Sequence, residues 1–311
     1  CNGRLLGVNE SGNLAVAGSD VAGPEVALHS RPACLPMGDV VALAPEGKTL
    51  LLLDKRLELK RQVSLNALPD AELVMADLLG NGSNFVIVLT DPSSRYPHGV
   101  LGDALEATSI SVFDEMLELQ SQFVLPEPFV FEQRRVTPLL SSKRGLLATR
   151  SSAQTGAGVI FLEWQDNALQ LSAEAPAIGL GNRWLNLFAS HGEFAYAVRT
   201  PHIGGPLQRY HLHEGTLELE AFDLGVTNHV IDSRNLDLAV LLEASNEQTL
   251  LAAPSQQRDR IRLIACATTC NVIQEWQLSA QLSSNLVRVQ LAGQRYLVAA
   301  DDSNKVWLWS Y

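Results

Sequence analysis

Two stretches decide the fold, LLLLDKRLEL at residues 50–59 and ISVFDEMLEL at residues 110–119. Each is an apolar run followed by an aspartate, two further residues and Leu-Glu-Leu. A short Asp side chain can accept hydrogen bonds from its own backbone, so Asp54 and Asp114 predict tight turns between two strands. Leu-Glu-Leu is then expected to begin an outer strand, with both leucines facing the neighbouring sheet and the glutamate facing water.

The same hairpin recurs along the whole chain. Strand-like runs that enter a turn and a second strand begin at six positions, Leu50, Ile110, Val159, Arg209, Ile261 and Val306. Their spacings are 60, 49, 50, 52 and 45 residues. Two further alternating runs precede each hairpin and supply inner strands. A strand-only repeat of about 50 residues is typical of a β-propeller with one four-stranded sheet per blade.

Six such blades use the whole chain. We therefore expect residues 1–311 to form one all-β domain, a six-bladed β-propeller of four-stranded antiparallel blades, with seven blades as the alternative. The sixth hairpin stops at Tyr311 without its outer strand. Since an open end would expose apolar faces and unpaired edges, residues 1–33 are expected to supply that strand and close the ring.

The charge of the chain limits the classes of partner. The formal net charge is −11, and no block of five or six like charges occurs. A nucleic-acid binder needs a basic stripe, so no nucleic-acid partner is expected. Surface charge also disfavours binding to an anionic bilayer. The sequence contains no run of 18 apolar residues, the length that a membrane-spanning helix needs. Membrane contact is expected only through a lipid anchor.

The first residues resemble the mature end of a bacterial lipoprotein. There, a signal peptide is removed just before a cysteine that becomes lipidated, as Cys1 would be here. The resemblance implies an exported protein, and Asn2 implies an outer-membrane lipoprotein that faces the periplasm or the cell surface. An arbitrary chain boundary or a simple disulfide cysteine are the alternatives. If Cys1 is lipidated, we expect Cys34 to be unpaired.

A second pair of cysteines encloses a three-residue turn. Cys266 and Cys270 flank Ala-Thr-Thr between two strand-like runs. Two cysteines that close such a hairpin lie near enough for a disulfide, which would agree with export to an oxidising compartment. Free thiols and a metal-binding pair are the alternatives. No second Cys or His pair of zinc-finger spacing accompanies them.

The stretch VMADLLGNGSNFVIVLTD at residues 74–91 resembles the FG-GAP/VCBS type of propeller repeat, in which Asp77, Gly80 and Gly82 match the family pattern. A calcium loop needs several oxygen ligands, and only Asp77 and Asn81 offer them here, so no calcium is expected. The resemblance implies a propeller of a kind that commonly serves as a binding scaffold.

Two histidines are weak candidates for a metal site. His211 and His213 are two residues apart on a strand, so both point to one face, and with Glu214 they could bind zinc or copper. A third ligand is not identifiable from the sequence. We therefore expect ordinary exposed histidines, no metal and no cofactor.

Two long loops carry related sequences, Tyr96-Pro97-His98-Gly99 and Thr200-Pro201-His202-Ile203-Gly204. In a four-stranded meander, the connections from the second to the third strand and from one blade to the next emerge on one face. Long loops usually carry recognition, so this long-loop face is the expected partner-binding surface. The loops are 91–107, 150–158, 199–208 and 254–260. Their expected contact residues are Arg95, Tyr96, His98, Arg150, His202 and Arg258.

Signatures of enzymes are missing from the sequence. It contains no G-x-S-x-G elbow, no P-loop and no H-E-x-x-H motif. The sequence therefore predicts a non-catalytic lipoprotein that serves as a scaffold or accessory subunit for a protein partner in the cell envelope. The alternative is a propeller enzyme or carbohydrate-binding protein with a site on the central axis. Convergent His, Arg and carboxylate side chains there would favour the alternative, and an apolar or loop-filled axis the scaffold.

Overall fold

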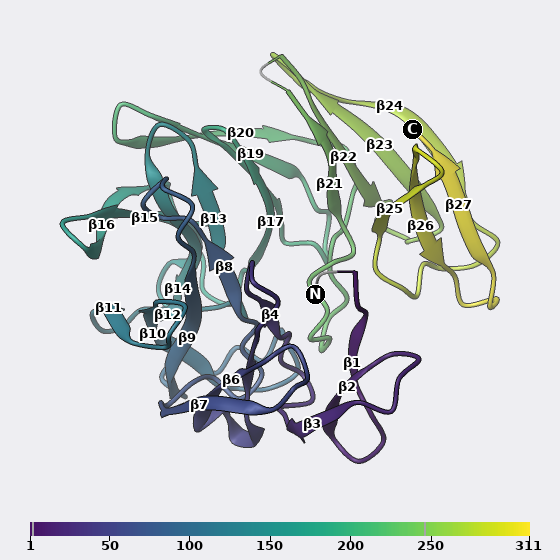
Figure 1. Ribbon diagram of the computed structural model, residues 1–311. Coiled ribbons are helices and arrows are strands. Elements are labelled where there is room, and N and C mark those ends of the chain that lie inside the picture. The colour runs from purple at the N-terminus through teal and green to yellow at the C-terminus, as the bar shows by residue number, and fades with distance from the viewer. Residues whose placement is uncertain (2, 246) are drawn as a thin grey trace.

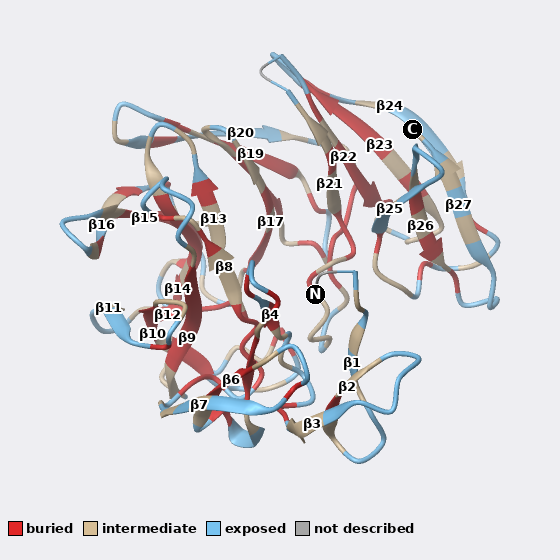
Figure 2. Ribbon diagram, viewed as in Figure 1, coloured by how far each residue is buried: buried red, intermediate tan, exposed pale blue. Residues whose placement is uncertain are grey.

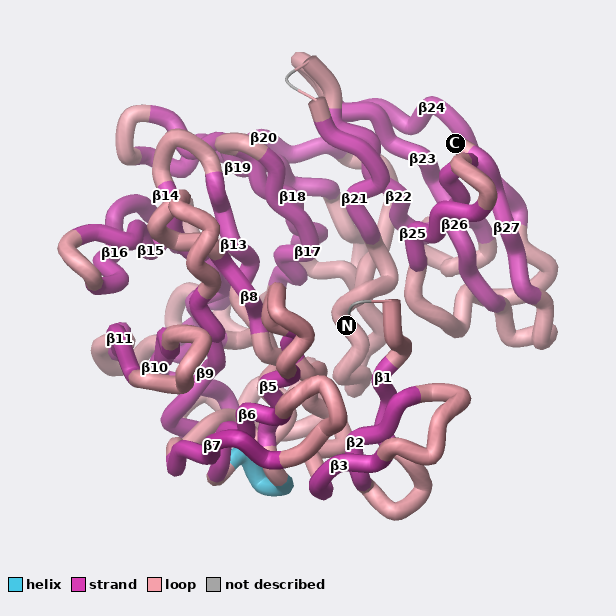
Figure 3. Tube along the Cα trace, viewed as in Figure 1, coloured by secondary structure: helices cyan, strands magenta, loops and turns pink. Residues whose placement is uncertain are grey.

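The computed structural model describes residues 1, 3–245 and 247–311. Asn2, which predicts outer-membrane sorting, lies outside the described residues. Within these ranges the chain is all-β, with one short 3-10 turn, η1 (Pro45–Gly47), and no α-helix (Figure 3). Accordingly, no helix of the described residues could span a membrane.

The strands form radial sheets that surround a common centre (Figure 1). Blade 1 comprises β4 (Ala33–Cys34), β5 (Val40–Leu43), β6 (Thr49–Leu53) and β7 (Leu59–Ser64). Blade 2 comprises β8 (Val74–Ala76), β9 (Phe85–Ser93), β10 (Glu106–Phe113) and β11 (Leu119–Val124). Blade 3 comprises β13 (Thr137–Leu140), β14 (Arg144–Ser152), β15 (Gly156–Gln165) and β16 (Ala168–Glu174). The short strand β12 (Val130–Phe131) pairs with both β10 and β14 and joins blades 2 and 3.

The second half of the chain continues the same order. Blade 4 comprises β17 (Leu185–His191), β18 (Phe194–Arg199), β19 (Leu207–His213) and β20 (Thr216–Phe222). Blade 5 comprises β21 (Val240–Ala244), β22 (Thr249–Pro254), β23 (Arg260–Cys266) and β24 (Cys270–Gln277). Blade 6 has three strands, β25 (Val287–Leu291), β26 (Gln294–Ala300) and β27 (Val306–Ser310). All six predicted hairpin starts fall in third strands.

The core lies between neighbouring blades. In blades 1 to 5 the second and third strands are mostly buried, as in β5 and β15. The outer strands β7 and β11, and the third strand β27 of blade 6, consist of exposed and half-buried residues (Figure 2). This gradient follows from the meander, because each outer strand covers its sheet on one edge and meets water on the other.

The repeated sequence forms the same turn twice. Asp54 Oδ1 accepts hydrogen bonds from the backbone N–H of Arg56 and Glu58, at 2.7 and 2.9 Å. Asp114 Oδ1 accepts bonds from the residues two and four positions later, at 2.9 and 2.8 Å. The prediction that these aspartates set the turns is confirmed.

The two leucines of each Leu-Glu-Leu do not face the same side, contrary to expectation. Leu57 and Leu117 are buried in the turn with φ of 65° and 59°, and both strands carry a register shift there. Leu59 and Leu119 are instead 54% and 57% exposed. A left-handed residue beside a bulge breaks the alternation of a strand, which moves the second leucine to the solvent side.

The N-terminal segment forms a sheet of its own. Its strands are β1 (Leu6–Val8), β2 (Asn13–Val16) and β3 (Ala22–Glu25), which pair with one another. Within the described ranges, β27 pairs with β26 alone, so the expected closure of the last blade by this segment is not found. Apolar side chains of β1 and β2 pack on the core of blade 1 instead. The described residues thus form six hydrogen-bonded sheets, one of which joins blades 2 and 3 through β12.

Both pairs of cysteines form disulfides. The predicted bridge between Cys266 and Cys270 is confirmed, with a Cα–Cα distance of 4.0 Å across the hairpin. Cys1 is bonded to Cys34, with Cα atoms 5.3 Å apart, which corresponds to the alternative of a simple disulfide cysteine at position 1. This second bridge ties the N-terminal sheet to β4. It also uses the sulfur that lipid attachment at Cys1 would need, so the two states exclude each other.

Candidate binding site on the long-loop face

The structure brings the two related loops together. His98 follows β9 in blade 2, and His202 follows β18 in blade 4. Both line one pocket of about 230 Å³. Trp184, which immediately precedes β17, forms another wall, and Ile203 and Ile231 lie at its rim. The connections of separate blades therefore build one site on the predicted face.

Trp184 fixes the shape of the pocket. Its side chain is buried, and Nε1 donates a hydrogen bond to the Glu132 carbonyl at 2.7 Å. The indole stacks on His202 with 6.2 Å between ring centroids and meets His229 edge-on at 4.7 Å. Sequence reasoning missed Trp184 and His229. The only available signal was the position of each in a connection between blades, which topology places on the same face.

The hydrogen bonds of the histidines define their protonation. His229 Nε2 lies 2.7 Å from the Ser233 carbonyl oxygen, which can only accept, so this nitrogen carries a proton. Burial lowers the pKa of His229 to about 4, so its Nδ1 is an acceptor at neutral pH. His202 Nε2 lies 2.8 Å from that Nδ1 and must donate to it. Burial, with His98 nearby, also lowers the pKa of His202, which leaves a neutral ring whose Nδ1 is an acceptor.

Buried acids lie behind His98. Its Nδ1 contacts Oε1 of Glu132, whose side chain is fully buried. Burial raises the pKa of Glu132, and in the described residues its Oε2 has no hydrogen-bond partner. Burial and the nearby Glu132 raise the pKa of Glu106 well above its usual range. A carboxylate behind an imidazole orients the ring, so Glu132 fixes how His98 faces the pocket.

Tyr96 lies inside the loop rather than on its surface. It is only 3% exposed, and its hydroxyl accepts a hydrogen bond from the backbone N–H of Asn182 at 2.9 Å. Burial raises its pKa to about 12. Tyr96 therefore holds the 94–105 loop against the connection between blades 3 and 4, and the expectation that it contacts a partner directly does not fit this burial.

The three predicted arginines lie outside the pocket and bond within the chain. Arg95 donates to the carbonyl of Phe129, and the Arg150 guanidinium lies 4.3 Å above the Phe129 ring. Arg150 also pairs with Glu174 at 2.6 Å. Arg258 donates to the connection between blades 5 and 6. Charge reversal at these arginines would disturb the loops themselves, so they are poor probes of a partner.

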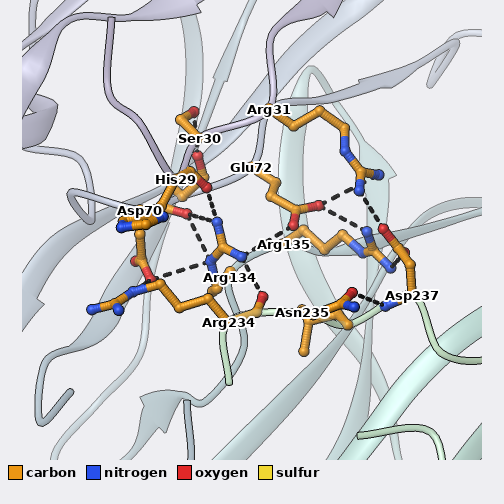
Figure 4. Close-up of polar contacts among 12 residues, drawn as sticks. His29, Ser30, Arg31, Asp70, Glu72, Arg134, Arg135, Arg234, Asn235 and Asp237 are labelled. Carbon is orange, nitrogen blue, oxygen red and sulfur yellow. Dashed lines mark hydrogen bonds and ion pairs between the residues drawn. The ribbon is translucent and has the colours of Figure 1, made fainter. Parts of the chain in front are cut away.

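The centre of the molecule holds a network of paired charges (Figure 4). Four arginines face four carboxylates, namely Arg31, Arg134, Arg135 and Arg234 with Asp70, Glu72, Asp103 and Asp237. They come from the connections that lead into the innermost strands, except Asp103, which belongs to the 94–105 loop. We call these eight residues the central ion-pair network.

Arg134 joins segments that are far apart in the chain. Its Nε lies 3.1 Å from Asp70 Oδ2, and one terminal nitrogen lies 3.4 Å from Glu72 Oε1. It also donates to the carbonyls of His29 and Arg234. Opposite it, burial would raise the pKa of Asp237, but arginine neighbours outweigh this effect and hold the pKa below its usual value. Each of the four arginines contacts at least one of the four carboxylates, so the network ties these connections together beside an open pocket of about 400 Å³.

The side chains of the weak metal-site candidates and of the FG-GAP-like stretch make contacts within the fold. His211 stacks on Phe194 and on His213, with centroids 4.5 and 5.4 Å apart. The described part of the chain contains no group of three or more metal-ligating side chains. In the FG-GAP-like stretch, Asp77 accepts hydrogen bonds from three successive backbone N–H groups, which begin at Gly80. Its carboxylate is thus used to hold a turn.

Comparison with known proteins identifies the fold. No protein-family model and no curated protein sequence matches the chain. The solved structure of BBS1N in complex with ARL6DN is similar, with 10% identity, a TM-score of 0.58 and coverage of 98% of this chain and 86% of that one. The Dos1 propeller also has a TM-score of 0.58, with 12% identity and coverage of 99% and 75%. These likenesses and the radial sheets show that the chain is a β-propeller.

Proposed function

We propose that this β-propeller is an exported, non-catalytic binding module of the cell envelope that docks a protein partner on its long-loop face. The observation that carries the proposal is the pocket between His98 and His202. Loops from blades 2 and 4 that share a Pro-His sequence converge there. Both loops are longer than a hairpin between their two strands requires.

The rim of the pocket has the character of a protein interface. Ile203 is 68% exposed and Ile231 is 59% exposed, and both flank the buried Trp184. Exposed apolar residues grouped around a rigid pocket mark interaction sites, because burial of their side chains drives association. The related fold of BBS1N was solved with ARL6DN bound, which supports the use of such a propeller as a protein-binding scaffold.

Export is supported by the two disulfides, because such bridges persist in oxidising compartments. A lipid on Cys1 would anchor the protein to the outer membrane. That anchor belongs to the proposal as the alternative chemical state of Cys1, in which Cys34 is a free thiol.

The alternative site on the central axis has less support. Arg and carboxylate side chains do converge there, but each contacts a partner of opposite charge. A pocket of about 400 Å³ lies beside these pairs, but the charged groups that line it already contact one another. The pocket beside His202 instead has exposed isoleucines at its rim, which suit a protein partner.

The experiment is co-purification of the tagged native protein from membranes, followed by identification of the associated proteins by mass spectrometry. Ile203→Asp should abolish recovery of the partner, because a charge would be buried at the apolar rim. Met116→Asp is the matched control, since Met116 is 55% exposed in the blade 2 hairpin turn on the opposite face. Recovery that survives Ile203→Asp and fails with Met116→Asp would overturn the proposal.

A further inference from the structure

We propose that the pocket between His98 and His202 holds one aromatic side chain of the partner that carries a hydrogen-bond donor, a tyrosine or a tryptophan, and that His202 Nδ1 accepts its hydrogen bond. This inference rests on the proposed function and specifies the chemistry of the same site. It follows from the size of the pocket, from its walls and from the direction of its hydrogen bonds.

The size of the pocket suits a single ring. Its volume is about 230 Å³. An engineered apolar cavity of about 150 Å³ in another protein accommodates benzene, so this pocket can take a ring with one substituent or a fused pair of rings. A larger ligand would extend beyond the pocket onto the rim at Ile203 and Ile231.

The walls offer aromatic and aliphatic contacts. The Trp184 and His202 rings are nearly parallel, with an interplanar angle of 13°, and Val100 and Pro201 complete the apolar lining. Aromatic pairs prefer offset-stacked or edge-to-face contacts, and a guest ring can meet either wall in this way. Trp184 is held by its bond to the Glu132 carbonyl, so the walls are formed before binding.

The hydrogen bonds determine what the guest must carry. The Ser233 carbonyl accepts a hydrogen bond from His229 Nε2–H, and His229 Nδ1 accepts one from His202 Nε2–H. His202 Nδ1 therefore has a free lone pair. No hydrogen-bond partner for this Nδ1 occurs in the described part of the chain. A guest without a donor would bury that lone pair unsatisfied, which is costly. A tyrosine hydroxyl or a tryptophan indole N–H would satisfy it.

The test is titration of the full-length protein with four small probes, the N-acetyl amides of tyrosine, tryptophan, phenylalanine and lysine. Binding is followed by NMR through the imidazole nitrogen resonances. We expect the tyrosine and tryptophan amides to bind at least tenfold more tightly than the phenylalanine amide, and to shift His202 Nδ1. Equal binding of phenylalanine, or preference for lysine, would overturn the inference.

Two variants separate this inference from the proposed function. His202→Phe keeps a ring beside Trp184 but removes the acceptor, so tyrosine and phenylalanine amides should then bind equally. His211→Phe, outside the pocket on β19, is the control and should leave the tenfold preference intact. If no amide binds while Ile203→Asp still abolishes recovery of the partner, the inference fails and the proposed function stands.

Discussion

At the scale of single residues, the pocket depends on histidines that stay uncharged. Burial lowers the pKa of His229 from its ordinary 6.5 to about 4, so the unfolded chain binds a proton more readily than the folded one. Stability is therefore full above about pH 6.5 and is lost as the pH falls toward 4. Through His229 alone, the free energy of unfolding should therefore fall by about 2 kcal/mol from pH 7 to pH 5.

Urea unfolding at the two pH values checks this prediction. His229→Gln removes the titrating group. Over the same pH interval, its free energy of unfolding should therefore fall by about 2 kcal/mol less than that of the native protein. His213→Gln is the control, because His213 is exposed. Other titrating groups are common to all three proteins. An identical pH dependence in His229→Gln would show that His229 is not buried as described.

The Cys1–Cys34 bridge makes a second prediction at this scale. It closes a loop with a sequence separation of 33 residues, whereas the Cys266–Cys270 bridge has a separation of 4. In the chain-entropy view, Cys34→Ser should lower the free energy of unfolding by about 2–4 kcal/mol, more than Cys266→Ser does. Peptide mapping without reductant gives the second readout. A free Cys34 thiol beside a lipidated Cys1 in protein extracted from membranes would contradict the bridge.

At the scale of elements, the Asp turn of the repeated hairpin leads into the outer strands of blades 1 and 2. Asp114 accepts two backbone hydrogen bonds, so Asp114→Ala should destabilise the protein by about 1–2 kcal/mol. Met116→Ala lies in the same turn with its side chain in water, and it should change stability by less than about 0.5 kcal/mol. Equal effects of the two variants in chemical unfolding would refute this role of Asp114.

Local chemistry explains which elements could be predicted from the sequence. The third strands and the Asp54 and Asp114 turns were predictable, because period and turn residues act over a few positions. The side taken by Leu59 was not, because it depends on a bulge. The independent N-terminal sheet was missed, and the sequence left open whether Cys34 is paired, since both depend on contacts between distant segments.

The candidate site was predictable to a similar extent. Meander topology alone places the His98 and His202 loops on one face, and the structure brings them to one pocket. Meander topology does not predict that Tyr96 points inward, or that Trp184 and His229 complete the pocket. These depend on packing between three blades, for which no single stretch of sequence carries a pattern.

At the scale of the whole molecule, the central ion-pair network holds the connections of several blades together. Arg134→Met would leave the buried carboxylates of Asp70 and Glu72 partly unpaired, so we expect the free energy of unfolding to fall by about 3–5 kcal/mol. Arg61→Met removes an exposed pair with Glu118 and should cost less than about 1 kcal/mol. Thermal unfolding compares the two. Similar losses would mean that the network does not stabilise the fold.

The central claim is that the long-loop face meets a protein partner, and site-specific photo-crosslinking tests it most directly. A photoreactive phenylalanine analogue is placed at Ile203 on the rim of the pocket or at Met116 on the opposite face, in cells that contain the native partner. A discrete crosslinked protein should form from position 203 and not from position 116. Crosslinking from position 116 alone would contradict the claim.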